Sequence, residues 1–253
     1  MDFTINQYKD FLKSIKSKDY EFQTFSEFIK TPKEKTIILR HDVDLLPLNS
    51  LRFAKIQNEL GIKGTYYFRA VPESWDENVI TKISEFGHEI GYHYENLTTK
   101  NGDMLLAIED FKKNLEKLRN LVPVSTICMH GSPKSKHDSK DLWKKYNYQD
   151  YGIVGEPYFD VDFNKVLYLT DTGRMWDGHN VSVRDRVNTS FNKNYHTTEQ
   201  IIKAFDFDQL QNQIMFTFHP QRWHEKPLQW IKELLFQNTK NIFKKYFFVK
   251  NQK

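Results

Sequence analysis

Two acidic residues stand where a predicted buried strand ends. Asp42 and Asp44 follow directly on the apolar run 36–39. Residues two apart on a strand point to the same face, so the two carboxylates converge while His41 and Val43 point away. Carboxylates held this close repel, share a proton or bind a cation. The alternative without chemistry is a cap, in which Asp44 bonds the backbone of the loop leading to the next helix.

A second stretch, 87–97, contains an imidazole and a carboxylate at the end of another strand. His93 and Glu95 share a face if the strand extends that far. Together with Asp44 they form a mixed nitrogen and oxygen ligand set with room for water, which is how a catalytic zinc or similar divalent ion is held. His88 lies earlier in the same strand, where we expect a structural histidine.

Two further histidines follow apolar runs. His130 comes after the run 126–129 and before turn residues, so a metal ligand, a substrate contact and a loop cap all stay open. His219 ends a strand that Pro220 stops. A histidine held in this way suits proton transfer near neutral pH, and a hydrogen bond to a neighbouring loop is the alternative.

Short apolar runs alternate with helical patterns, which favours repeated strand–helix units and a mainly parallel sheet. The clearest helix covers 103–122, where apolar residues recur every three or four positions. We predict strands at 36–41, 65–69, 88–94, 125–129, 166–170, 181–183 and 214–219, and helices at 5–16, 49–60, 79–86, 103–122, 140–146, 198–205 and 227–236.

The candidate residues share one position in this pattern, the carboxyl end of a strand. In α/β barrels that rim forms the active site, because the loops of all strands meet there. We therefore predict an α/β fold, a distorted parallel (β/α) barrel in a single domain over 1–253, with an N-terminal helical extension at 1–30. The rim residues are Asp42, Asp44, His93, Glu95, His130, Asp171 and His219.

The amino-acid composition argues against some classes of function. Hydrophobic residues make up 39% of the 253 residues and the net charge is +4 without a dense basic block, which argues against nucleic-acid binding. The basic C-terminal segment 240–246 leaves peripheral contact with an anionic membrane surface as an option. Cys128 is the single cysteine, in an apolar run, and fits a buried thiol in a reducing compartment. With no apparent signal peptide or membrane span, we expect a cytoplasmic protein.

These stretches, from about 36 to 223, resemble the polysaccharide deacetylases, the NodB-homology domains of the family 4 carbohydrate esterases. The match is most specific over 88–93, and the chain is similar to the cytoplasmic variants of surface-polysaccharide biosynthesis with an Arg-His-Asp-Val-Asp motif. The resemblance implies that Asp42 is the catalytic base, Asp44 and His93 are metal ligands, and His219 is the general acid. The implied cofactor is zinc, with cobalt, nickel or manganese as alternatives.

Two positions depart from the family pattern. The family's second ligand histidine corresponds to Leu97, which cannot bind a metal. The third ligand is then His130, Glu95 or absent, and His130 would restore two imidazoles and one carboxylate. The family also has an arginine motif after its fourth strand that orients the base. This chain has none there, and Arg40, two residues before Asp42, is our candidate for that role.

The resemblance implies hydrolysis of an N-acetyl or related acyl group from an amino sugar, as a small molecule or in a lipid-linked glycan precursor. Glu95, Asp171, Arg174, Trp176 and Trp223 are the expected substrate-binding residues. The two tryptophans fit a core position equally well, and Asp171 and Arg174 fit a mutual pair. A carbohydrate-binding pseudoenzyme, with the metal site damaged at position 97, is the rival function.

Overall fold

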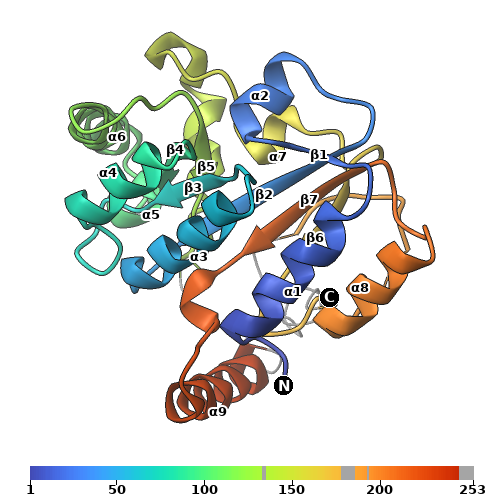
Figure 1. Ribbon diagram of the computed structural model, residues 1–253. Coiled ribbons are helices and arrows are strands. Elements are labelled where there is room, and N and C mark those ends of the chain that lie inside the picture. Colours follow the sequence, from blue (N-terminus) through green and yellow to red (C-terminus); the bar gives the residue numbers. More distant parts are fainter. Residues whose placement is uncertain (133–134, 178–185, 193, 245–253) are drawn as a thin grey trace.

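The computed structural model describes residues 1–132, 135–177, 186–192 and 194–244 (Figure 1). The helices are α1 (Ile5–Lys16), α2 (Phe25–Lys30), α3 (Pro47–Glu59), α4 (Glu77–Glu85), α5 (Asn96–Thr99), α6 (Met104–Arg119), α7 (Pro157–Asp160), α8 (Thr198–Asp206) and α9 (Pro227–Lys244), with short 3₁₀ turns η1 (Ser139–Lys144), η2 (Tyr148–Tyr151) and η4 (Pro220–Arg222). No helix in these ranges is long and apolar enough to cross a bilayer.

One parallel sheet organises these elements. Its strand order is β5-β4-β3-β2-β7-β6, and β1 joins the first half of β2 while β3 pairs with the second half. The strands are β1 (Glu21–Gln23), β2 (Thr36–Val43), β3 (Thr65–Phe68), β4 (Glu89–Tyr94), β5 (Ile127–Met129), β6 (Leu167–Thr170) and β7 (Gln213–Phe218). Within the described residues β5 and β6 do not pair, so the predicted parallel α/β fold is confirmed as a half-barrel.

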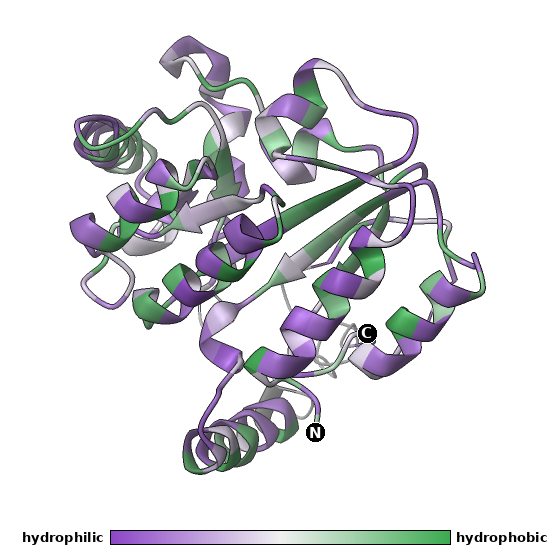
Figure 2. Ribbon diagram, viewed as in Figure 1, coloured by the Kyte–Doolittle hydropathy of each residue, from purple (hydrophilic) through white to green (hydrophobic). Residues whose placement is uncertain are grey.

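Both faces of the sheet are covered. Every residue of β2 is buried, as expected for a central parallel strand, and Figure 2 shows this strand in green. On one face Ile37 and Leu39 pack in a large cluster with α1 and α3, which cross the near side of the sheet in Figure 1. On the other face Ile38 packs with Tyr67 and Phe28 of α2.

The predicted elements are largely present, with differences at short segments. The segment expected to be a helix at 140–146 is instead largely covered by the short 3₁₀ turn η1. The strand β1 and the helix α2 lie inside the segment expected to be a helical extension, and both are too short to show a periodic pattern. The strand expected at 181–183 lies outside the described residues.

Candidate metal and acid–base site

The carboxyl edge of the sheet brings together Arg40 and Asp42, which lie two residues apart on one face of β2. Arg40 Nε donates to Asp42 Oδ1 over 2.8 Å, and Arg40 Nη2 donates to Oδ2 over 2.6 Å. Both side chains are almost fully buried. The paired, charge-assisted geometry holds the Asp42 carboxylate in one orientation, as expected for the arginine proposed to orient it.

Asp44 lies one step further along, and it does not cap a helix. The residue preceding α3 is Leu46, which makes no side-chain capping bond. Asp44 Oδ2 instead accepts a 2.9 Å hydrogen bond from Gln221 Nε2, while Oδ1 is shielded from solvent and has no hydrogen-bond partner. The capping alternative for Asp44 is therefore wrong.

Two imidazoles from neighbouring strands face this unpartnered oxygen. The Nε2 atoms of His93 and His130 each lie 3.6 Å from Asp44 Oδ1. His93 Nδ1 is 2.9 Å from the carbonyl oxygen of Cys128, and His130 Nδ1 is 2.8 Å from Glu95 Oε2. A carbonyl or carboxylate oxygen can only accept, so each Nδ1 carries the hydrogen and a neutral ring presents a lone pair at Nε2.

The lone pairs of both imidazoles therefore face the unpartnered Asp44 oxygen. This arrangement is repulsive unless a proton or a cation lies among the three atoms. Burial raises the pKa of Asp44, but a hydrogen bond from the His93 imidazole and the charges of His130 and His219, when these rings are protonated, hold it well below its usual range. Ligand atoms bound to tetrahedral zinc are roughly 3.3 Å apart, so the two 3.6 Å separations from Asp44 Oδ1 fit a divalent ion held by this carboxylate together with His93 and His130.

A second group of potential ligands overlaps this one. Ligand atoms of Asp42, His93 and Cys128 lie within 4.8 Å of one another. Both oxygens of Asp42 already accept hydrogen bonds from Arg40, however, whereas Asp44 Oδ1 has no partner. The set built on Asp44 therefore offers the better cation site, because binding there satisfies a buried oxygen without breaking an ion pair.

His219 is oriented by a hydrogen bond to a carboxylate, as a general acid or base requires. Its Nδ1 lies 2.6 Å from Asp171 Oδ1, and its Nε2 lies 4.0 Å from Asp44 Oδ2. Asp171 is fully buried; burial raises its pKa, but His219 and Arg222 lower it below the usual value overall. The carboxylate thus fixes the ring so that Nε2 faces the cation site, which is the position for proton transfer.

Three residues of the site escaped the sequence-based prediction. Arg69 pairs with Glu95 over 2.6 Å, Gln221 binds Asp44, and Arg222 Nη1 donates to the backbone oxygen of Asp171 over 2.8 Å. Arg69 follows the end of β3, and the rule that selected the other strand ends would have found it. Nothing in the local sequence distinguishes Gln221 and Arg222.

The two predicted sugar-binding tryptophans are in the core, so this expectation was wrong. Trp223 is fully buried and its Nε1 donates to Asp171 Oδ2 over 2.7 Å. Trp176 is 4% exposed, and its Nε1 donates to Thr198. Their rings pack against Phe218, so neither presents a face to a sugar.

The remaining expected substrate contacts are also engaged within the protein. Asp171 lies behind His219, and Glu95 lies between His130 and Arg69. Arg174 is 7% exposed; its guanidinium stacks on Trp230 and donates to the Trp230 backbone oxygen. Arg174 Nε and Nη2 are shielded from solvent and have no hydrogen-bond partner, so only part of the guanidinium is engaged. The ion pairs of Asp171 are with His219 and Arg222, and the described contacts do not include the alternative pair with Arg174.

Two histidines are structural. His88 Nδ1 accepts from the Gly64 backbone N–H, and Nε2 lies 2.9 Å from the Ala54 carbonyl oxygen, which confirms the structural interpretation. His41 points to the opposite face from Asp42 and Asp44, as predicted, where its ring stacks on Tyr66. Cys128 is buried, as expected.

No protein-family model and no curated protein matches this chain. Among solved structures it is similar to a family 4 carbohydrate esterase (CE4) pseudoenzyme from Bacillus anthracis, with 14% identity and a TM-score of 0.43. That match covers 85% of this chain and 63% of the other, so the chain spans less than two thirds of that protein.

Two other structures are similar at the same level. The Xyl-CE4 domain of a multidomain xylanase from the hindgut metagenome of Trinervitermes trinervoides has 13% identity and a TM-score of 0.40, with coverage of 87% and 85%. A family 4 carbohydrate esterase from Bacillus anthracis has 10% identity and a TM-score of 0.41, with coverage of 85% and 79%. These similarities identify neither a substrate nor a metal for this chain.

Proposed function

We propose that this chain is a metal-dependent hydrolase that removes an N-acetyl or related acyl group from an amino sugar in a glycan precursor. The observation that carries the proposal is the approach of His93 Nε2 and His130 Nε2, each to 3.6 Å, to the buried and unpartnered Asp44 Oδ1. The resemblance of the motif around Asp42 and His93 to the polysaccharide deacetylases supports the choice of reaction.

Asp44, His93 and His130 would hold the cation, with zinc as the first candidate and cobalt, nickel or manganese as alternatives. Such an ion supplies Lewis acidity, which polarises a substrate carbonyl and lowers the pKa of water. Position 97 contributes no ligand to the cation, because the Leu97 side chain is 2% exposed and packs in the core. His130 replaces the missing imidazole from β5.

The protein's own groups then move two protons. Asp42, held by Arg40 and with Oδ2 3.7 Å from His93 Nε2, accepts a proton from the attacking water. His219, held at Nδ1 by Asp171, donates a proton from Nε2 to the departing amine nitrogen. The lone cysteine is compatible with the cytoplasmic location that we retain in the proposal.

Metal binding and turnover are tested separately. The purified chain is titrated with zinc, cobalt and nickel, and acetate release is followed on N-acetylated sugar nucleotides and oligosaccharides. We expect about one ion per chain, loss of that ion in Asp44→Ala, and retained ion with turnover lowered by about 10²-fold or more in Asp42→Asn. Activity that survives in Asp42→Asn contradicts the assignment of the base.

A carbohydrate-binding pseudoenzyme is the second candidate, favoured by the buried leucine at position 97. It predicts sugar affinity with no bound ion and no acetate release. A crystal soaked with metal and measured for anomalous scattering at the carboxyl edge of the sheet separates the two functions.

A further inference from the structure

The C-terminal helix α9 turns polar side chains toward the body of the protein. Gln237 and Asn241 are 4% and 7% exposed, and Asn241 Nδ2 donates to the Gly173 carbonyl oxygen over 2.8 Å. Trp230 Nε1 donates to the Asp2 carbonyl oxygen over 2.6 Å. These bonds fix the rotation of α9 about its axis, so the helix cannot turn its other face inward without breaking them.

The outward face of α9 is apolar. Leu228, Ile231, Leu235 and Ile242 are 75%, 46%, 63% and 61% exposed. Their spacing of three, four and seven residues places all four on one stripe of an α-helix. Ordinary surface helices bury such a stripe against the core, whereas α9 presents it to the surroundings.

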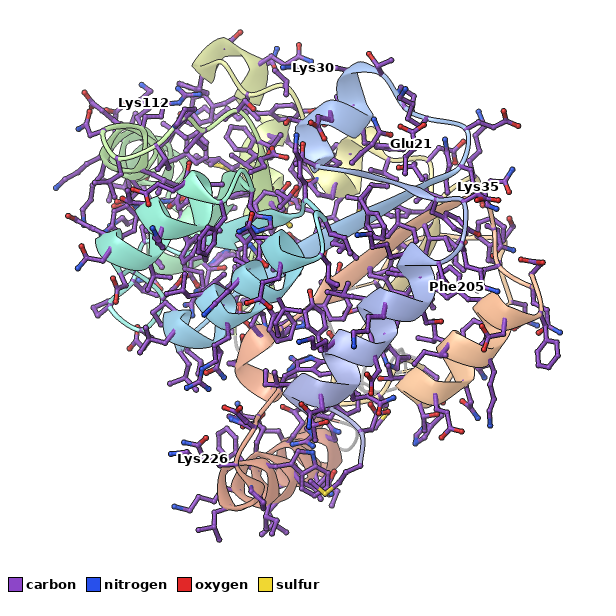
Figure 3. All side chains as sticks on the ribbon, in the orientation of Figure 1. Glu21, Lys30, Lys35, Lys112, Phe205 and Lys226 are labelled. Atoms are coloured by element: carbon purple, nitrogen blue, oxygen red, sulfur yellow. The ribbon has the colours of Figure 1, made fainter. Side chains whose placement is uncertain are left out.

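Lysine side chains lie on the same helix as this apolar stripe. Lys226, Lys232 and Lys240 are exposed, and Figure 3 shows Lys226 beside the start of α9. Lys240 Nζ lies 4.0 Å from the ring centroid of Phe236, which is 54% exposed. Of the nearby acids Glu225 is exposed, whereas Glu233 is partly buried within the field of Arg174 and Arg222. The exposed surface of α9 therefore combines apolar side chains with net positive charge.

We propose that α9 binds the surface of an anionic lipid bilayer, with the apolar stripe in the interface and the lysines at the headgroups. Apolar residues beside lysines are the chemistry by which interfacial helices bind such surfaces. A second copy of this chain fits less well, because both paired faces would carry net positive charge. Four apolar side chains are also few against the roughly 20–30 residues per partner of a stable interface.

The position of α9 relates this surface to the candidate site. The chain passes from β7 through η4 into α9, and Figure 1 shows α9 beyond the end to which β7 points. Gln221 of η4 binds Asp44. Leu46, which precedes α3, and Leu48, in the first turn of α3, are 48% and 60% exposed. If the proposed function holds, binding would bring this edge to a lipid-linked amino sugar; membrane binding itself does not depend on that function.

The test is sedimentation of the full chain with vesicles of phosphatidylcholine alone and of phosphatidylcholine mixed with phosphatidylglycerol. We expect binding to the mixed vesicles, weakened by added salt, and a loss of about tenfold or more in Leu228→Ser/Leu235→Ser. The matched control is Leu105→Ser/Leu106→Ser on α6, where the leucines are 63% and 56% exposed. Circular dichroism checks that both variants are folded.

Three results would overturn the proposal. The first is no sedimentation with the anionic vesicles. The second is an equal loss of binding in the α6 control. The third is a dimer, formed without vesicles and dissociated by Leu228→Ser/Leu235→Ser, in a chain that does not bind lipid. None of these measurements requires a metal. A failure of the membrane-binding proposal can therefore be distinguished from a failure of the proposed hydrolase function.

Discussion

At the scale of single residues, the orientation of His130 depends on Glu95. The carboxylate accepts from His130 Nδ1 and is itself held by Arg69, so Nε2 is directed at Asp44. Such partners of ligand histidines contribute to metal affinity by fixing the tautomer and raising basicity. Glu95 therefore orients His130, so that the imidazole presents Nε2 to Asp44.

We expect Glu95→Gln to weaken zinc binding by about 10- to 100-fold, because the amide supplies less negative charge to His130. Competition with a chromophoric chelator measures the affinity. His130→Ala should lose more affinity than Glu95→Gln, and Glu116→Gln, an exposed acid on α6, should lose none. Equal affinity in Glu95→Gln and the unmodified chain would show that Glu95 does not support a ligand.

His88 makes stability depend on pH. Burial, opposed by the bond to Ala54 and aided by Lys63, lowers its pKa from 6.5 to about 4. Between these values the unfolded chain binds a proton that the folded chain does not. The contribution of His88 is therefore complete above pH 6.5 and is lost as the pH falls toward 4, by up to about 1.4 kcal/mol per pH unit.

Urea unfolding between pH 7 and pH 5 measures this slope. We expect His88→Gln to be less stable at neutral pH, because it loses packing and one of two hydrogen bonds, and to show a flatter dependence on pH. His41, whose pKa burial lowers to about 3, keeps its own contribution in the variant. Parallel slopes in the two proteins would show that His88 takes up its proton equally in both states.

At the scale of elements, the spacing between β3 and β4 depends on Gly91. Tyr67 pairs with Gly91 across the two strands, and a methyl group at position 91 would overlap the Tyr67 ring. His93 lies two residues further on the same face of β4. The absence of a side chain at 91 thus lets an aromatic ring pack directly beneath the strand that carries a candidate ligand.

Gly91→Ala should destabilise the protein by about 1–3 kcal/mol through overpacking, measured by chemical denaturation. Tyr67→Leu removes the overlapping ring, so the double variant should be more stable than the sum of the two single changes predicts. Strict additivity in this cycle would contradict the close approach of Tyr67 to position 91.

At the scale of the whole molecule, the first residues join elements that are distant in sequence. Asp2 accepts from Thr198 Oγ1 over 2.6 Å and from the Thr198 backbone N–H over 2.8 Å at the start of α8. The Asp2 carbonyl oxygen accepts from Trp230 of α9. Phe3 packs on Trp223, which in turn holds Asp171. The N-terminus therefore supports both the C-terminal helix and the residues behind His219.

Asp2→Ala should lower the free energy of unfolding by about 1–2 kcal/mol, because two donors at the start of α8 lose their acceptor. Asp10→Ala, at an exposed position of α1, is the matched control and should change it by less than about 0.5 kcal/mol. Urea denaturation of both variants measures the difference, and equal effects would contradict the anchoring role of Asp2.

The alternation of strands and helices, and the position of the candidate residues at strand ends, could be predicted from the amino-acid sequence. Both follow from local periodicity, because apolar spacing records which side of an element is buried. Asp42 and Asp44 on one face of β2, with His41 on the other, needed only the two-residue repeat of a strand.

Which strand ends lie next to one another depends on how the strands pair in the folded chain, and local periodicity does not predict that pairing. The proximity of His130 to Asp44 depends on β5 pairing with β4, a contact between residues more than thirty positions apart. Trp176 and Trp223 follow strands just as the site residues do, yet they fill the core, because neighbouring aromatic rings leave them no path to the surface. The outward apolar stripe of α9 also depends on long-range bonds, since the sequence alone predicts that such a stripe faces inward.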